Sequence, residues 1–167
     1  LSRIDNGSIV YGKESVNLST LTHNAHLLWE PIFFEHGLTL DAQIDCSVSL
    51  QASELHLKQL WDILLDNALK YRREDVTPEL SVSTRNIGDE KVEIIISDNG
   101  IGIKKEDLKK IFEKFYRVST GNRHDVKGFG LGLAYVHKLI TQFKGNIHVE
   151  SEVNKGSKFI IILPLIK

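Results

Sequence analysis

Residues Lys91 to Gly102, KVEIIISDNGIG, combine an apolar run with a glycine-rich turn, and the predicted fold is built outward from them. Val92 to Ser97 is rich in β-branched residues and is bounded by turn residues, so it predicts a buried strand. The strand runs directly into Asp98-Asn99-Gly100-Ile101-Gly102. An Asn-Gly pair after a strand is explained by a turn alone, and that is the simpler interpretation of these residues.

Asp98 also permits a functional interpretation. A carboxylate at a buried strand end only accepts hydrogen bonds, so it fits the exocyclic amino group of adenine and repels the carbonyl that guanine presents there. Gly100 and Gly102 would let the backbone lie close to a flat ring. The turn and the adenine site both stay open on these residues alone.

Helices and strands are predicted on both sides of this stretch. Three helices are expected: one capped by Ser19 that runs to about His36 and ends at Gly37, one capped by Ser53, and one stopped by Gly145. The apolar residues of the second and third helices recur three and four positions apart; they are Leu57, Leu60, Trp61, Leu64 and Ala68, then Leu133, Val136, Ile140 and Phe143. Alternating strands are expected at 39–44 and 48–52, in one antiparallel layer, and at 16–18, 80–84, 146–151 and 157–163. This order predicts an α+β fold, a two-layer α/β sandwich with a mixed, mainly antiparallel sheet and about three helices on one face.

Composition excludes several classes of protein. The 167 residues carry 21 Lys and Arg against 22 Asp and Glu, a net charge of −1, so no nucleic-acid-binding surface is indicated. A single cysteine, Cys46, allows no internal disulfide and favours a buried structural thiol. No apolar run approaches the roughly 20 residues of a membrane span. The sequence lacks Met and starts at Leu1, so we expect a piece of a longer protein, with residues 1–13 as a short helical end that runs into a linker.

The second helix carries a possible ligand for a metal and for phosphate. Ile63, Asn67 and Lys70 lie four and three residues apart and share a face. A partly exposed helix edge is the plain explanation. An amide oxygen can ligate Mg²⁺, and an ammonium can meet phosphate.

A glycine-rich turn opens the third helix. Three glycines in the five residues 128–132 are unfavourable in a helix, each costing about 1 kcal/mol relative to Ala, so the turn is either a hinge or an anion site at a helix N-terminus. The spacing fits neither a dinucleotide fingerprint nor a P-loop. Residues 104–127 hold eight Lys and Arg against four Asp and Glu, a net charge of +4, which leaves −5 for the rest of the chain. A solvated basic loop remains an alternative, but a cover over a triphosphate explains both the charge and the glycines.

In this order the motifs resemble the catalytic and ATP-binding domain of sensor histidine kinases, in the superfamily that also holds gyrase, MutL and the ninety-kilodalton heat-shock chaperone. Residues 66–71 (DNALKY) look like the family's N box, 98–102 like its first glycine box, and 112–117 (FEKFYR) like its F box. Residues 128–133 look like the second glycine box. Residues 156–164 resemble the Gly-Thr-x-Phe ending, with Ser157 in place of Thr. The resemblance implies a Bergerat-type ATP-binding fold over 14–167, with an ATP lid at about 103–127.

The resemblance also implies roles for individual residues. Asn67 would bind Mg²⁺, Lys70 and Arg117 would approach the phosphates, and Asp98 would recognise adenine. The remaining residues expected around ATP are Tyr71, Gly100, Gly102, Ile103, Phe115, Gly128, Gly130, Leu131, Gly132, Leu133 and Ser157.

The same resemblance implies an enzyme and its partners. The domain would transfer the γ-phosphate of ATP to a histidine on an upstream dimerisation domain, for relay to an aspartate of a response regulator. The whole protein would be a homodimeric, membrane-associated bacterial sensor with this domain in the cytoplasm, and the fragment would bind ATP without phosphorylating itself. Ile63 departs from the family, where Asn or Glu is common, which disfavours water activation. A non-catalytic nucleotide-binding module, or a serine kinase similar to anti-sigma factors, therefore stays an alternative.

Overall fold

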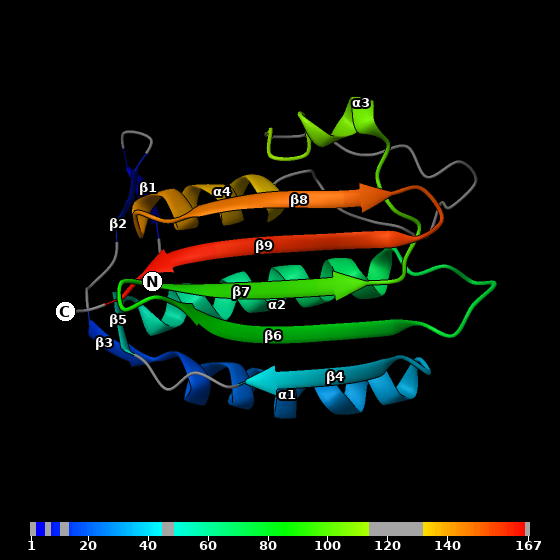
Figure 1. The fold of residues 1–167 in the computed structure, drawn as a ribbon, viewed down its shortest axis with the longest axis horizontal. Coiled ribbons are helices and arrows are strands. Elements are labelled where there is room, and N and C mark those ends of the chain that lie inside the picture. Colours follow the sequence, from blue (N-terminus) through cyan, green and yellow to red (C-terminus); the bar gives the residue numbers. More distant parts are fainter. Residues whose placement is uncertain (1–2, 6–7, 11–13, 45–48, 114–131, 166–167) are drawn as a thin grey trace.

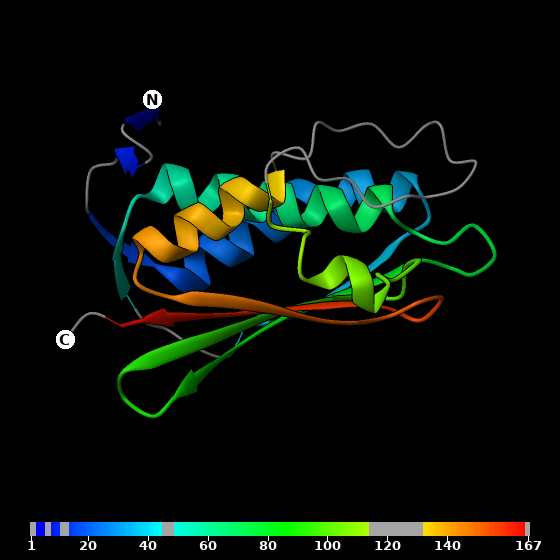
Figure 2. The same cartoon turned by 90° about the horizontal axis from the view of Figure 1, so that it is seen from above.

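The structure is a computed structural model that describes residues 3–5, 8–10, 14–44, 49–113 and 132–165. Its centre is a five-stranded sheet in the order β4 (Thr39–Ile44), β6 (Glu79–Ile87), β7 (Lys91–Asp98), β9 (Gly156–Pro164) and β8 (Asn146–Glu152). Three helices lie on one face of the sheet: α1 (Leu18–Glu35), α2 (Glu54–Lys70) and α4 (Gly132–Gln142) (Figures 1 and 2). The predicted two-layer α+β sandwich is confirmed.

The core lies between the sheet and the helices because the strands alternate. In β7, Val92, Ile94 and Ile96 are buried, and on β9 the partner of Ile94 is the fully buried Ile161. The predicted stripe of α2 meets them, with Trp61 only 2% exposed. Burial of a large apolar side chain contributes about 1.5–3 kcal/mol, so this layer supplies much of the stability.

Only some of the residues that end the helices are predicted correctly from the sequence. The cap of α1 is Asn17, whose side-chain oxygen accepts a hydrogen bond from the Thr20 amide at 2.9 Å, so the predicted cap Ser19 is wrong. Ser53 does cap α2, as predicted, and accepts from the His56 amide at 3.4 Å. After α4 the left-handed residue is Lys144, with φ of 64°. Gly145 follows it because a Cβ there would overlap the Ile162 carbonyl oxygen.

Two of the strand predictions are corrected. β4 pairs with β6 in parallel, since β5 (Ser49–Ala52) and α2 form the crossover between them. β5 itself pairs with β3 (Glu14–Asn17), outside the main sheet, so 39–44 and 48–52 do not share one antiparallel layer.

The chain start also differs from the prediction. The sequence predicts a helical end within residues 1–13, but β1 (Arg3–Asp5) and β2 (Ser8–Val10) pair there as antiparallel strands. Their β-branched residues and the Asn-Gly sequence between them favour a hairpin over a helix. Within the described ranges, no helix combines the length and the apolar character that a membrane crossing needs. Cys46 lies outside those ranges.

Candidate functional site

A pocket opens where the C-terminal end of α2, the end of β7 and the start of α4 meet over β9. It is mostly apolar, and its lining residues are Asn67, Tyr71, Asp98, Ile101, Gly102, Ile103, Leu133, Ser157 and Phe159. Asp98 is the last residue of β7, and Ser157 is its direct partner on β9. The pocket therefore has mostly apolar walls with a few polar groups, the usual composition of a small-molecule site.

Asp98 is the charged residue of this wall. Burial raises the pKa of Asp98 from 3.8 to about 6, and hydrogen bonds from the backbone amides of Gly100 and Ser157 oppose that rise. The Gly100 amide lies 2.8 Å from Asp98 Oδ1. At pH 7 the group is thus mainly an ionised acceptor, held in place by its own loop.

The loop after Asp98 is fixed from two sides. The Ile101 amide donates to the Tyr71 carbonyl at 2.9 Å, and the Asn154 amide donates to the Ile101 carbonyl at 2.8 Å. The loop is therefore held between the end of α2 and the turn that joins β8 to β9.

The two glycines of this loop are required by space. A Cβ on Gly100 would lie 2.5 Å from the Tyr71 carbonyl oxygen, and a Cβ on Gly102 would overlap the carbonyl oxygen of Glu152. Gly102 also has φ of +75°, which favours glycine. Close backbone approach, as well as a turn, therefore explains the motif.

Asn99 has a structural role beside the pocket. Its side-chain oxygen accepts from the Glu79 amide at 2.8 Å, and its side-chain nitrogen donates to the Thr77 carbonyl at 3.0 Å. These bonds tie the loop to the segment that enters β6.

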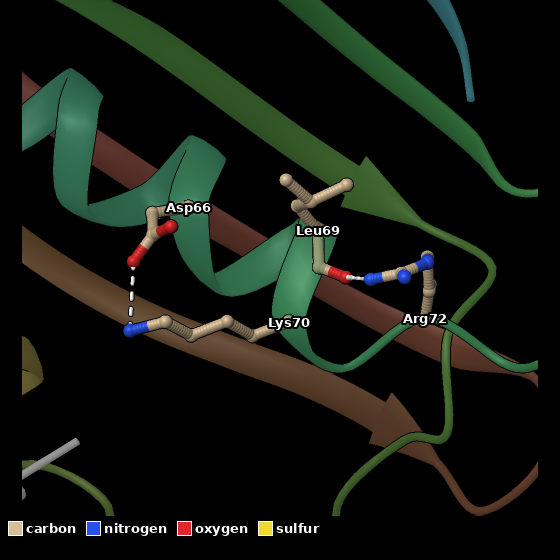
Figure 3. A network of polar contacts seen from close by, with 4 residues as sticks. All are labelled: Asp66, Leu69, Lys70 and Arg72. Carbon is tan, nitrogen blue, oxygen red and sulfur yellow. Dashed lines mark hydrogen bonds and ion pairs between the residues drawn. The ribbon is translucent and has the colours of Figure 1, made fainter. Parts of the chain in front are cut away.

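The end of α2 places two residues on the pocket wall and two beside it. Asn67 and Tyr71 line the pocket. Lys70 instead donates to Asp66, one turn earlier, at 2.9 Å (Figure 3). Arg72, just past the helix, donates to the Leu69 carbonyl (Figure 3). Lys70 is not among the lining residues, so its approach to phosphate stays a prediction.

Apart from Lys70, the predicted site residues separate into three groups. Seven line one pocket: Asn67, Tyr71, Asp98, Gly102, Ile103, Leu133 and Ser157. Gly100 backs this wall, and Gly132 opens α4, where a Cβ would lie 3.2 Å from Ile63 Cγ2. Five lie outside the described residues: Phe115, Arg117, Gly128, Gly130 and Leu131.

Two pocket residues, Ile101 and Phe159, are missing from the prediction. The alternation of β9 could have indicated Phe159, since it shares a face with Ser157. Ile101 lies inside the glycine motif, where its contacts depend on the fold of the loop.

Comparisons with known proteins agree with this geometry. Residues 52–167 match the family described as histidine kinase-, DNA gyrase B-, and HSP90-like ATPase. "Sensor protein RprX" of Bacteroides fragilis is 59% identical over 116 residues, which are 70% of this chain and 22% of RprX. The chain thus spans less than a quarter of the length of that relative.

Solved structures share the fold. The catalytic domain of histidine kinase ThkA, in a nucleotide-free form, matches with a TM-score of 0.79 and 24% identity, over 93% of this chain and 99% of that one. ThkA in complex with the response regulator protein TrrA gives a TM-score of 0.74 at 21% identity, over 92% of this chain and 42% of that one. Full-length ShkA in complex with AMPPNP gives 0.80 at 24% identity, over 96% of this chain and 32% of that one.

The family match covers more than half of the chain and includes every described residue of the pocket. The resemblance to sensor histidine kinase catalytic domains is confirmed by the relatives and by the shared fold. The chain belongs to the family of histidine kinase-, DNA gyrase B- and HSP90-like ATPases.

Proposed function

We propose that this chain is the ATP-binding catalytic domain of a sensor histidine kinase, and that the pocket around Asp98 holds the adenine of ATP. The observation that carries the proposal is a buried acceptor, Asp98, on the wall of a mostly apolar pocket. A purine buries its faces against apolar side chains and presents donor hydrogens at its amino group. Ile101, Ile103 and Phe159 supply the apolar surface, and Asp98 supplies the acceptor.

The phosphates would extend from this pocket toward α4. Leu133 lines the pocket one residue after the start of α4, so the helix N-terminus lies beside it. The partial positive charge of a helix N-terminus favours an anion. The basic residues of 104–127 would add positive charge along the same path.

Mg²⁺ fits the side chain that α2 presents. Asn67 lines the pocket, and its side-chain amide makes no hydrogen bond within the part of the chain that the structure describes. Mg²⁺ takes one or two protein oxygens, with water and substrate phosphates as its other ligands. Asn67 would hold the ion through its side-chain oxygen, and the ion, when bound, would neutralise part of the phosphate charge.

The reaction would be transfer of the γ-phosphate to a histidine outside this chain. An imidazole nitrogen forms the bond to the γ-phosphorus as the bond to the bridging oxygen breaks and ADP leaves. The names of the relatives support this proposal, since RprX is a sensor protein and ThkA is a histidine kinase that forms a complex with a response regulator. A dimerisation domain upstream of residue 1, a homodimeric membrane-associated sensor and relay to a response regulator belong to the same proposal.

The test is transfer from γ-labelled ATP in the protein that contains this chain and its upstream helices. Wild type should label a histidine, and Asn67→Ala should reduce the labelling at least tenfold. Labelling of Asn67→Ala at the wild-type rate would refute the metal role, and absence of labelling in wild type would refute the kinase.

A second candidate function follows from Ile63. Its side chain lies against Gly132 at the start of α4, where many family members would place a polar residue. This apolar contact favours a module in which bound ATP sets the position of α4 and no phosphate is transferred. Such a module would bind ATP tightly and leave the upstream histidine unlabelled.

A further inference from the structure

Ser151, on β8, is a polar residue that neither the sequence motifs nor the proposed function uses. Its hydroxyl oxygen makes three contacts of 2.8 Å each: it accepts from the Ile103 amide, donates to the Gly156 carbonyl, and lies against the Ser157 hydroxyl. Ser151 and Ser157 are direct partners across β8 and β9, so their side chains share a face of the sheet. One hydroxyl on β8 thus contacts two other segments around the pocket, the loop after β7 and the start of β9.

The proton count of this cluster allows one arrangement. A serine hydroxyl has a single hydrogen to donate. The Gly156 carbonyl is only an acceptor, so its contact with Ser151 consumes the hydrogen of Ser151. The contact between the two hydroxyls must then use the hydrogen of Ser157. Ser157 therefore turns only lone pairs toward the pocket that it lines.

From this we infer that Ser151 is a positioning residue for base recognition: it holds the hydrogen of Ser157 away from the pocket and fixes the Ile103 amide at the pocket edge. The inference rests on the proposed binding of ATP. With its hydrogen committed to Ser151, Ser157 cannot donate to the carbonyl that hypoxanthine or guanine carries in place of the adenine amino group. Ser151 thereby adds discrimination against oxopurines to that supplied by Asp98.

The surroundings of Ser151 support a role in positioning. Ile103 lines the pocket, and Gly156 lies so close to Asp98 that a Cβ on it would overlap the Asp98 carbonyl oxygen. Gly156, whose carbonyl accepts from Ser151, is therefore in direct contact with Asp98, the residue proposed to recognise the base. A change at Ser151 reaches the pocket through both Ser157 and Ile103.

The experiment measures binding of ATP and of inosine triphosphate to the 167-residue chain by calorimetry. Ser151→Ala frees the hydrogen of Ser157, so the preference for ATP over inosine triphosphate should fall roughly five- to tenfold, the equivalent of one hydrogen bond. Ser151→Thr restores a hydroxyl and should restore the preference. Ser83→Ala, on the opposite face of the sheet, is the matched control and should leave the preference unchanged. Partial unfolding of a variant would lower its affinities for ATP and for inosine triphosphate by the same factor. The ratio of the two affinities therefore distinguishes a loss of positioning from a loss of stability.

A second readout does not depend on nucleotide. Hydrogen exchange of the Ile103 amide should speed up in Ser151→Ala, because that amide loses its acceptor, and should stay slow in Ser151→Thr. If wild type prefers ATP but Ser151→Ala keeps the same preference, this inference is overturned and the proposed function stands. If wild type shows no preference for ATP, the proposed function fails and the inference fails with it.

Discussion

Replacement of Asp98 by asparagine is expected to stabilise the fold while it weakens ATP binding. Burial raises the pKa of Asp98 from 3.8 to about 6. The difference between these pKa values corresponds to a cost on the order of 3 kcal/mol that the ionised carboxylate imposes on the folded chain at pH 7. Asp98→Asn removes the ionised group and therefore removes this cost.

The pH window follows from the sign of the pKa change. Because the folded chain binds the proton of Asp98 more tightly than the unfolded chain, the folding stability falls as the pH rises from 3.8 to about 6 and is then constant. Below that window the carboxyl is protonated in both states and the cost disappears.

The asparagine brings a smaller cost of its own. Asp98 accepts from the backbone amides of Gly100 and Ser157, and an asparagine keeps one acceptor oxygen in place of two. Loss of one such bond costs about 1 kcal/mol, so the net gain in the free energy of unfolding at pH 7 is about 2 kcal/mol. At pH 4 the variant should gain nothing.

The assay is urea denaturation of wild type and Asp98→Asn at pH 7 and at pH 4, with ATP affinity measured in parallel. Asp89→Asn is the control, because Asp89 is exposed and its substitution should change the stability by less than about 0.5 kcal/mol. A variant that is no more stable than wild type at pH 7, or that gains as much at pH 4, would refute the burial argument.

Three further predictions concern binding and the glycine loop. The ATP affinity of wild type, measured by calorimetry, should fall as the pH drops through about 6, because protonation of Asp98 removes its charge. Asp98→Asn should lack this fall in affinity. A fall of equal size in both proteins would show that Asp98 is not its cause. Asn67→Ala should bind ATP equally with Mg²⁺ and with a chelator, and a retained Mg²⁺ effect would exclude Asn67 as a ligand. Gly102→Ala should cost roughly 2–4 kcal/mol in thermal unfolding, because its Cβ would overlap the Glu152 carbonyl oxygen. Gly88→Ala, at φ of +60° with nothing within 4 Å, should cost only about 1 kcal/mol, and equal costs would contradict the steric account.

Local patterns predict much of this fold. The apolar stripe of α2 and the alternation of β6, β7 and β9 depend only on the periods of a helix and a strand, so their buried faces follow from the sequence. Asp98 can be identified from the sequence as a candidate site residue for a related reason. It is a carboxylate at the end of a buried strand, where the strand leaves the core.

Non-local contacts account for what the sequence does not predict. The parallel pairing of β4 with β6 depends on the path of the chain through β5 and α2. Ser151 belongs to the site because β8 and β9 pair in a register that places it opposite Ser157. The spacing of Lys70 to Asn67 suggests a place at the phosphates, but the same spacing rule places Lys70 one turn from Asp66, with which it pairs.

Recognition of adenine by Asp98 is tested by calorimetry of ATP and of GTP binding to the 167-residue chain in the presence of Mg²⁺. ATP is expected to bind at least about fivefold more tightly than GTP, since the buried acceptor at Asp98 distinguishes the two bases, and Asp98→Ala should lower this preference. Equal affinities of wild type for ATP and GTP would contradict the recognition of adenine by Asp98.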